Sequence, residues 1–189
     1  FEAKGSKKDK IIIKGDKFSG TIFFNSNQSI SIENVIFQNL TNNRSKHNQP
    51  SSITFYECKS IKILNSSFLS NLRGDDYINF FRSEGIYLDN LTFKDVLFDA
   101  IDSDFSNLEI INSNFKDIGN DAIDGSGSEI LISNNYFENV MDKAISAGED
   151  SSFNINNSVF ISNEIALVAK DGSSITSKDN ILINNNLDL

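Results

Sequence analysis

One short motif recurs along almost the whole chain and constrains the fold more than any other feature. An asparagine follows an alternating apolar pair, and a phenylalanine follows three residues after it. The asparagines are Asn34, Asn65, Asn90, Asn112, Asn134 and Asn157, with Asp179 as a degenerate last copy. The phenylalanines are Phe37, Phe68, Phe93, Phe115, Phe137 and Phe160, with Leu182 closing the series. Such a repeat predicts a stack of similar units in which each copy contacts its neighbours.

A third column is aliphatic, and its late steps are 22 residues long. It comprises Ile22, Ile53, Ile78, Ile101, Ile123, Ile145 and Leu167. Alternation such as Leu108-Glu109-Ile110 has the period of a strand with one buried face. A unit this short has no room for a crossover helix, so successive parallel strands must coil, with about 4.8 Å between coils. We therefore predict an all-β fold, a single-stranded right-handed parallel β-helix (solenoid) of about seven coils of roughly 22 residues.

The columns have physical explanations within such a coil. Asparagine tolerates the left-handed backbone of a tight corner, and its amide can bond the equivalent amide one coil away. The phenylalanine column is expected to stack inside. The chain length suits one domain, residues 1-189. Ile11–Ile13 and Ile181–Ile183 read as strands with open outer edges, which fits a fragment of a larger chain, flanking domains or end-to-end self-association.

Composition excludes several classes of partner. The formal net charge of -9 and a pI near 4.6 oppose binding to nucleic acid or to an anionic membrane. No apolar run reaches the roughly 18 residues of a membrane helix, so we expect no membrane insertion, and no signal peptide precedes Phe1 in the given chain. The single cysteine, Cys58, excludes an internal disulfide, and the single histidine, His47, disfavours a Ser-His-Asp triad.

Two early repeats are longer than the rest. The aliphatic column steps by 31 residues from Ile22 to Ile53 and by 25 from Ile53 to Ile78. The extra residues fall around Thr41 to Ser51 and Ser70 to Asp75, where two loops on one corner could wall the next strand. Insertions on one side of a repeat rod mark a working face, although loop drift gives the same pattern.

The strand that carries the aliphatic column is rich in charge. Its copies include Asp76-Tyr77-Ile78-Asn79, Asp99-Ala100-Ile101-Asp102, Asp121-Ala122-Ile123-Asp124 and Lys143-Ala144-Ile145-Ser146. If the isoleucines point inward, the following residues form one outward row. Asp104 is expected on the same face as Ser126 and Lys170, and Tyr77 and Phe81 are expected to face outward beside it. The predicted binding residues are Tyr77, Asn79, Phe81, Asp102, Asp104, Asp124, Ser146 and Lys170.

The stacked carboxylates indicate a catalytic or binding role, because like charges one coil apart repel each other and so destabilise the fold. Crowding of two carboxylates raises the pKa of one of them, as a general acid requires. The distance between carboxylates one coil apart resembles the spacing of about 5 Å between the two catalytic carboxylates of retaining glycosidases. Two coils, from Asp76 to Asp121, approach the wider inverting spacing. Asp102 and Asp124 could instead hold calcium. A structural interpretation stays open for Asp76, Asp99 and Asp121, as corner residues that bond backbone amides.

The repeats resemble the pectin-lyase-like superfamily, which includes pectate lyases and polygalacturonases. The segment from Gly119 to Ser128 is similar to the polygalacturonase segment with paired aspartates, and Asp99-Ala100-Ile101-Asp102 to the segment upstream of it. The resemblance implies that Asp99 and Asp121 are acid/base candidates. This chain departs from that pattern, because Asn120 replaces one aspartate and Lys143-Ala144 replaces a catalytic His-Gly pair. Of a later Arg-x-Lys, Lys170 alone is present. The chain looks closer to bacterial surface proteins with β-helix repeats.

Three functions follow. The first is a secreted or cell-surface module that binds glycan or calcium through its acidic strand, with a polysaccharide or surface glycan as partner. The second is an enzyme on acidic polysaccharide: a polygalacturonase-like hydrolase using Asp99 and Asp121, or a lyase using Lys143 as base while calcium or Lys170 neutralises the uronate. The third is a structural or assembly rod.

Overall fold

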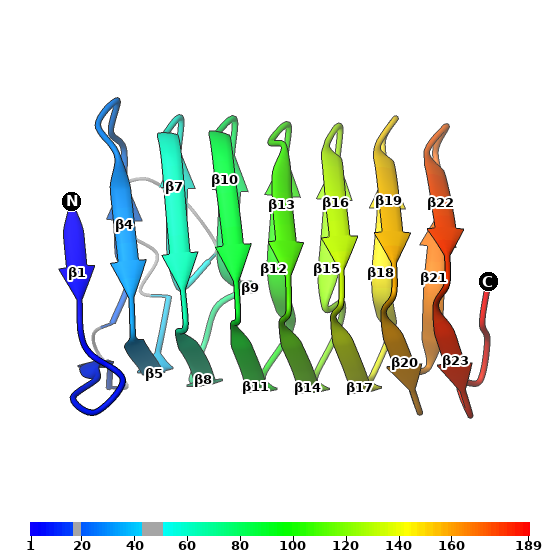
Figure 1. Ribbon diagram of the computed structural model, residues 1–189, viewed down its shortest axis with the longest axis horizontal. Helices are drawn as coiled ribbons and strands as arrows, with labels where there is room; N and C mark the ends of the chain where they lie inside the picture. The colour runs from blue at the N-terminus through cyan, green and yellow to red at the C-terminus, as the bar shows by residue number, and fades with distance from the viewer. Residues whose placement is uncertain (17–19, 43–50) are drawn as a thin grey trace.

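The structure, a computed structural model, describes residues 1–16, 20–42 and 51–189, and all of its described strands are parallel (Figure 1). Sheet A contains β1 (Glu2–Lys4), β4 (Ile30–Glu33), β7 (Lys59–Leu64), β10 (Glu84–Asp89), β13 (Leu108–Ile111), β16 (Glu129–Ser133), β19 (Ser152–Asn156) and β22 (Ser174–Lys178). Sheet B contains β2 (Ile11–Lys14), β5 (Val35–Leu40), β8 (Ser67–Asn71), β11 (Thr92–Val96), β14 (Asn114–Ile118), β17 (Tyr136–Val140), β20 (Val159–Ile161) and β23 (Ile181–Ile183). Sheet C contains β3 (Ile22–Phe24), β6 (Ile53–Tyr56), β9 (Asp76–Phe81), β12 (Asp99–Asp104), β15 (Ile123–Ser126), β18 (Lys143–Gly148) and β21 (Ile165–Ala169).

Each coil contributes one strand to each sheet, so neighbours within a sheet differ by three in strand number (Figure 1). The register is the one that the sequence columns predict. Ile101 pairs with Ile123, and Ile123 pairs with Ile145. Phe93 likewise pairs with Phe115. The predicted parallel β-helix is confirmed, and residues that form a column in the sequence lie in neighbouring strands.

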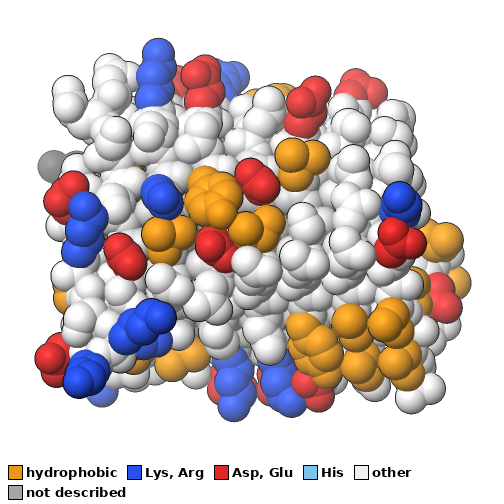
Figure 2. Space-filling model, viewed as in Figure 1, with side chains coloured by type: hydrophobic (Ala, Val, Ile, Leu, Met, Phe, Trp, Pro, Cys, Tyr) orange, Lys and Arg blue, Asp and Glu red, His pale blue; other side chains and the backbone are white. Residues whose placement is uncertain are grey.

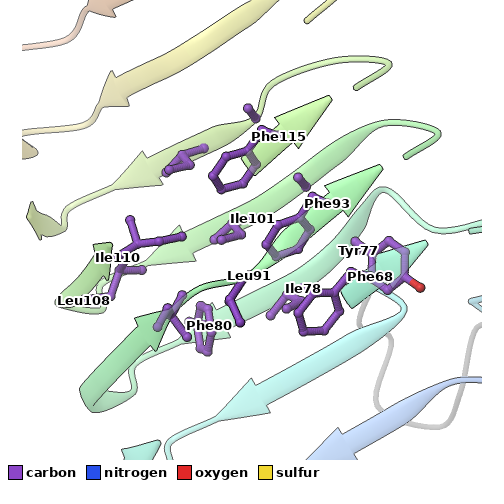
Figure 3. Close-up of a cluster of buried hydrophobic side chains, with 14 of the residues drawn as sticks. Phe68, Tyr77, Ile78, Phe80, Leu91, Phe93, Ile101, Leu108, Ile110 and Phe115 are labelled. Carbon is purple, nitrogen blue, oxygen red and sulfur yellow. The ribbon is translucent and has the colours of Figure 1, made fainter. Parts of the chain in front are cut away.

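The phenylalanine column stacks inside the rod, as predicted. Successive rings from Phe37 to Phe160 lie 4.6–5.1 Å apart between centroids, with interplanar angles of 1–11°. Figure 3 shows Phe68, Phe93 and Phe115 one above the other, beside Ile78 and Ile101. These rings are buried. Offset aromatic stacking adds about 0.5–1.5 kcal/mol per pair to the free energy gained from burying area.

The asparagine corners adopt the predicted left-handed backbone. Asn34, Asn65, Asn90, Asn112, Asn134, Asn157 and Asp179 all have φ between 50° and 55°. The expected bond between equivalent amides occurs between Asn90 Nδ2 and Asn65 Oδ1, at 2.7 Å. Asn112 bonds the Asp89 carboxylate instead, and Asn34 bonds the carbonyl of Gly5. The left-handed backbone conformation is therefore the shared property of this column. The hydrogen bond between side-chain amides is only one of several ways in which these side chains find a partner.

A second corner holds an internal serine column that sequence analysis did not single out. It follows sheet C in four successive coils and consists of Ser83, Ser106, Ser128 and Ser151. Each hydroxyl accepts a hydrogen bond from a backbone N–H one coil earlier: Cys58, Ser83, Ser106 and Ser128 respectively, at 2.8–3.1 Å. A buried N–H left without a partner would destabilise the fold, so these serines are part of the framework.

The longer repeats are only partly within the described residues. Most of the first expected loop, with His47, lies outside them. The second loop leaves β8 at Asn71 and rejoins sheet C at Asp76. At the ends of the sheets lie β1, β2 and β3 on one side and β21, β22 and β23 on the other. Stacking of further coils or partners at these ends stays a prediction.

Replacing one ring of the phenylalanine column should destabilise the fold strongly. Phe115→Ala removes a fully buried ring that stacks at 4.9 Å on both Phe93 and Phe137. We expect a loss of about 3–5 kcal/mol in the free energy of unfolding. Leu131→Ala, at a side chain 52% exposed on sheet A, should cost less than about 1 kcal/mol. Urea denaturation followed by circular dichroism measures both, and equal losses would contradict the buried column.

Removing one internal serine should also be costly. In Ser128→Ala the buried N–H of Ser106 loses its acceptor, so we expect a loss of about 1–3 kcal/mol. Ser133→Ala, on the partly exposed end of β16, makes the same chemical change as a control. The same denaturation experiment applies, and a Ser128 variant as stable as the Ser133 variant would show that the serine column is dispensable.

Candidate functional site

The outer face of sheet C carries three rows of side chains that run along the rod. The central row is Thr54, Asn79, Asp102, Asp124 and Ser146. The distal row, two residues further along each strand, is Tyr56, Phe81, Asp104 and Ser126. The corner row, at or just before the start of each strand, is Asp76, Asp99, Asp121 and Lys143. Register therefore brings the sequence-predicted residues together, apart from Tyr77 and Lys170.

The prediction that Tyr77 faces outward is wrong. Its side chain is fully buried, lies edge-on to Phe68 and Phe93, and donates its hydroxyl hydrogen toward the carbonyls of Phe37 and Leu69 at 3.1 and 3.2 Å. Figure 3 shows the ring beside Phe68. Burial raises the pKa of this phenol. The physical reason is the corner, because Ala100, Ala122, Ala144 and Ala166 are also fully buried. Strict alternation begins only after this position.

The central row is joined to the distal row by hydrogen bonds. The Asn79 amide nitrogen donates to Asp102 Oδ2 at 2.7 Å and to Asp104 Oδ2 at 2.9 Å. Asn79 is 2% exposed and Ser146 is not exposed, so both lie beneath the outermost side chains of the face. Four atoms of this row are buried without a protein hydrogen-bond partner: Thr54 Oγ1, Asn79 Oδ1, Asp124 Oδ1 and Ser146 Oγ. Such groups are rare in folded proteins and each calls for an explanation.

On this face, the carboxyl groups of Asp76 and Asp102 have raised pKa values. Burial, and then the charges of Asp76, Asp104 and Asp124, raise the pKa of Asp102. Burial also raises the pKa of Asp76, and the charge of Asp99 adds to the effect, although a hydrogen bond from the Ser51 hydroxyl at 2.8 Å opposes it. These two carboxyl groups therefore hold their protons more tightly than isolated carboxyl groups do.

The three catalytic candidates in the corner row have structural partners. Asp99 Oδ1 accepts hydrogen bonds from the Asp121 backbone N–H at 2.8 Å and from the Asn120 amide at 2.6 Å. Asp121 Oδ1 in turn accepts from the Lys143 backbone N–H at 2.9 Å. These bonds support the interpretation of Asp99 and Asp121 as corner residues that bond backbone amides. Burial raises the pKa of Asp99 to about 6, although both of its hydrogen bonds oppose the shift.

Lys143 is held by two carboxylates. Its ammonium lies 3.1 Å from Asp121 Oδ1 and also bonds Asp142. Burial lowers the pKa of Lys143, but the hydrogen bond to Asp142 and the charge of Asp121 outweigh burial, so the net pKa is raised. A general base needs a pKa near the working pH. This environment therefore favours the charged, proton-holding form of Lys143.

An aromatic strip lies beside the acidic central row, and sequence analysis found only Phe81 of its members. We define the strip as Phe23, Tyr56, Phe81 and Phe105. Tyr56 stacks on Phe81 with centroids 5.3 Å apart and on Phe23 at 6.0 Å. Phe105, 54% exposed, meets Phe81 edge-on at 6.3 Å. The Arg82 guanidinium lies 5.1 Å from the Phe81 ring centroid. The signal for Tyr56 was present, because it follows Ile53 as Phe81 follows Ile78.

The remaining predicted binding residue, Lys170, lies further along the rod. Lys170 is exposed, and its stem lies over Gly148, where an added Cβ would be 3.0 Å from Lys170 Cε. Among the described residues no group of three or more His, Cys, Asp or Glu side chains is arranged to hold a metal ion. Within the same residues no helix is long and apolar enough to cross a membrane.

The other faces differ in character from sheet C. Figure 2 views sheet A and shows acidic, basic and apolar side chains interspersed over it. An apolar patch lies at the lower right, over β17, β20 and β23. Ile181 and Ile183 are exposed there, next to Val159 and Ile161 in register. Sheet C is distinguished by an aromatic strip flanking a row of hydrogen-bonding groups.

Comparison with known proteins defines the class. A family model described as "Right handed beta helix region" matches residues 76–188, more than half of the chain, so the chain belongs to this family. The right-handed coiling predicted from sequence agrees with this assignment. A similar solved structure is that of PfbA, a surface adhesin of Streptococcus pneumoniae, at 12% identity and a TM-score of 0.26 over 95% of this chain and 70% of that one. No curated protein matches the chain in sequence.

The raised pKa of Asp102 should make stability depend on pH. A carboxyl that holds its proton more tightly when folded stabilises the fold at acid pH, and this contribution is lost as the pH rises above about 4 through the raised folded-state value. Asp102→Asn, which mimics the protonated form, should therefore lose less stability than the parent between about pH 4 and about pH 8. Denaturation midpoints across this range test the prediction, with Glu109→Gln on exposed sheet A as control. Parallel pH profiles for the parent and Asp102→Asn would contradict it.

Proposed function

We propose that this chain is a non-catalytic β-helix module that binds a glycan through the outer face of sheet C. The observation that carries the proposal is the juxtaposition of the aromatic strip with the Asn79–Asp102–Asp104 cluster. Binding sites for small molecules combine apolar surface with a few polar groups that fix orientation. A sugar ring offers both an apolar C–H surface and hydroxyls. The strip and the cluster match those two parts.

We also propose that the module acts outside the cell or at its surface, where surface glycans would be its ligands. Calcium is the weaker ligand candidate. It requires six to eight oxygen ligands. Asp102 and Asp124 lie in adjacent coils, but Asn79 presents its amide nitrogen, a donor, to Asp102. That donor is unsuited to a cation site.

The enzyme alternative has less support from the geometry. Asp99 and Asp121 hold backbone N–H groups one coil on, and Lys143 is held by Asp121 and Asp142. Each candidate thus has a structural role that explains its position without catalysis. The proposal accordingly assigns binding, with no bond cleavage, to this face.

Binding should depend on the polar rows. The double variant Asp104→Asn, Asp124→Asn removes two acceptor carboxylates and should weaken glycan binding about tenfold or more. The matched control, Glu109→Gln with Glu129→Gln, makes the same changes on exposed sheet A and should bind as the parent does. A glycan array followed by calorimetry on the best ligands measures both.

Turnover assays complete this test. The parent chain should release neither reducing ends nor unsaturated, ultraviolet-absorbing product from the glycans it binds. Release that is abolished by Asp121→Asn or by Lys143→Ala would refute the binding-module proposal in favour of an enzyme. If the folded chain bound no glycan, both the binding-module proposal and the enzyme alternative would be refuted.

A further inference from the structure

The charges around the candidate face identify the kind of glycan that fits it. The acidic side chains of the central, corner and distal rows are Asp76, Asp99, Asp102, Asp104, Asp121 and Asp124. Lys143, the basic member of these rows, already bonds two carboxylates. Lys170 is exposed and lies over Gly148, the residue paired with Ser126, at the far end of the distal row. Arg82 lies over the Phe81 and Phe105 rings, beyond the end of β9. An anionic ligand would be repelled by those of these carboxylates that are ionised.

The atoms of the central row that lack a hydrogen-bond partner also favour an uncharged ligand. Asn79 Oδ1 is an acceptor on a side chain only 2% exposed, and Asp124 Oδ1 is a second such acceptor. The fully buried Ser146 hydroxyl and the Thr54 hydroxyl also lack partners. A sugar hydroxyl both donates and accepts, so it could satisfy such atoms once the side chains that cover them move aside. An ionised uronate carboxylate only accepts, so it offers nothing to Asn79 Oδ1 or Asp124 Oδ1.

The spacing of the strip fits a ligand that lies along the rod. Tyr56 and Phe81 occupy neighbouring coils with centroids 5.3 Å apart, and Phe105 extends the apolar surface into the next coil. A pyranose ring in an extended polymer is about as long as one coil is high, so successive sugars would meet successive coils. The central row then lies beside the sugars over the same coils.

We infer that the ligand of sheet C is an uncharged polysaccharide lying along the rod axis, with its sugars on Tyr56, Phe81 and Phe105 and its hydroxyls toward the Asn79–Asp102–Asp104 cluster. The inference rests on the proposed function and narrows it. It also departs from the expectation of an acidic polysaccharide, which followed from the family resemblance and not from this face.

The test compares uncharged and uronate oligosaccharides of equal length on the intact chain. The probes are neutral hexose and N-acetylhexosamine oligomers, oligogalacturonate and oligoalginate, measured by isothermal titration calorimetry at low and high salt. At least one neutral oligomer should bind at least about tenfold more tightly than either uronate, with little dependence on salt. Tyr56→Ala and Phe81→Ala should each weaken it by about tenfold or more.

Controls separate the ligand class from the fold and from the proposed function. Tyr87→Ala, on the outer side of sheet A, should leave binding unchanged, and circular dichroism should show that every variant retains its sheet content. Uronates that bind more tightly than the neutral oligomers, and lose affinity in Arg82→Gln, would overturn the inference while leaving glycan binding intact. Neutral binding that survives both aromatic substitutions would also overturn it. If the chain bound none of the probes, the proposed function itself would be refuted.

Discussion

The structure depends on each coil satisfying the backbone of the coil next to it. Within the sheets this is done by strand pairing, but the corners interrupt the pairing and leave buried N–H groups. At the corner after sheet C, a serine hydroxyl accepts the N–H one coil earlier, as Ser128 does for Ser106. At the start of sheet C, Asp99 and Asp121 accept N–H groups one coil later. These corner bonds fix the register, and the register places every column.

The same constraint produces the unusual electrostatics of sheet C. A fixed register puts Asp102 beside Asp124 and forces Asp76 and Asp104 into their neighbourhood. Burial keeps these groups from water, so the pKa of Asp102 rises and the Asn79 amide becomes its principal partner. A fold that needed only stability could fill such positions with serine or threonine, as it does at Ser146 and Thr54. The carboxylates beside a partly exposed aromatic strip are what make this face a candidate for recognition.

Much of the fold could be predicted from sequence because residues that contact each other in neighbouring coils of a β-helix recur at a regular spacing in the sequence. The phenylalanine, asparagine and isoleucine columns were visible and lie in register as expected. Tyr77 was misplaced because alternation holds within a strand and fails at a corner, where successive residues both turn inward. The serine column was missed because serine in a polar sequence gives no pattern of hydrophobicity. Arg82 and Phe105 were missed because they follow their strands, at left-handed positions with φ of 47° and 49°.

The most direct test of the account is to map the ligand-contacting surface on the intact chain by NMR. Titration with a neutral oligosaccharide that binds should perturb backbone amide signals at Tyr56, Asn79, Phe81, Asp104 and Phe105, one group of shifts per coil along sheet C. Shifts centred instead on Tyr87 and Leu131 of sheet A, or on the apolar patch over β17, β20 and β23, would show that sheet C is not the binding face.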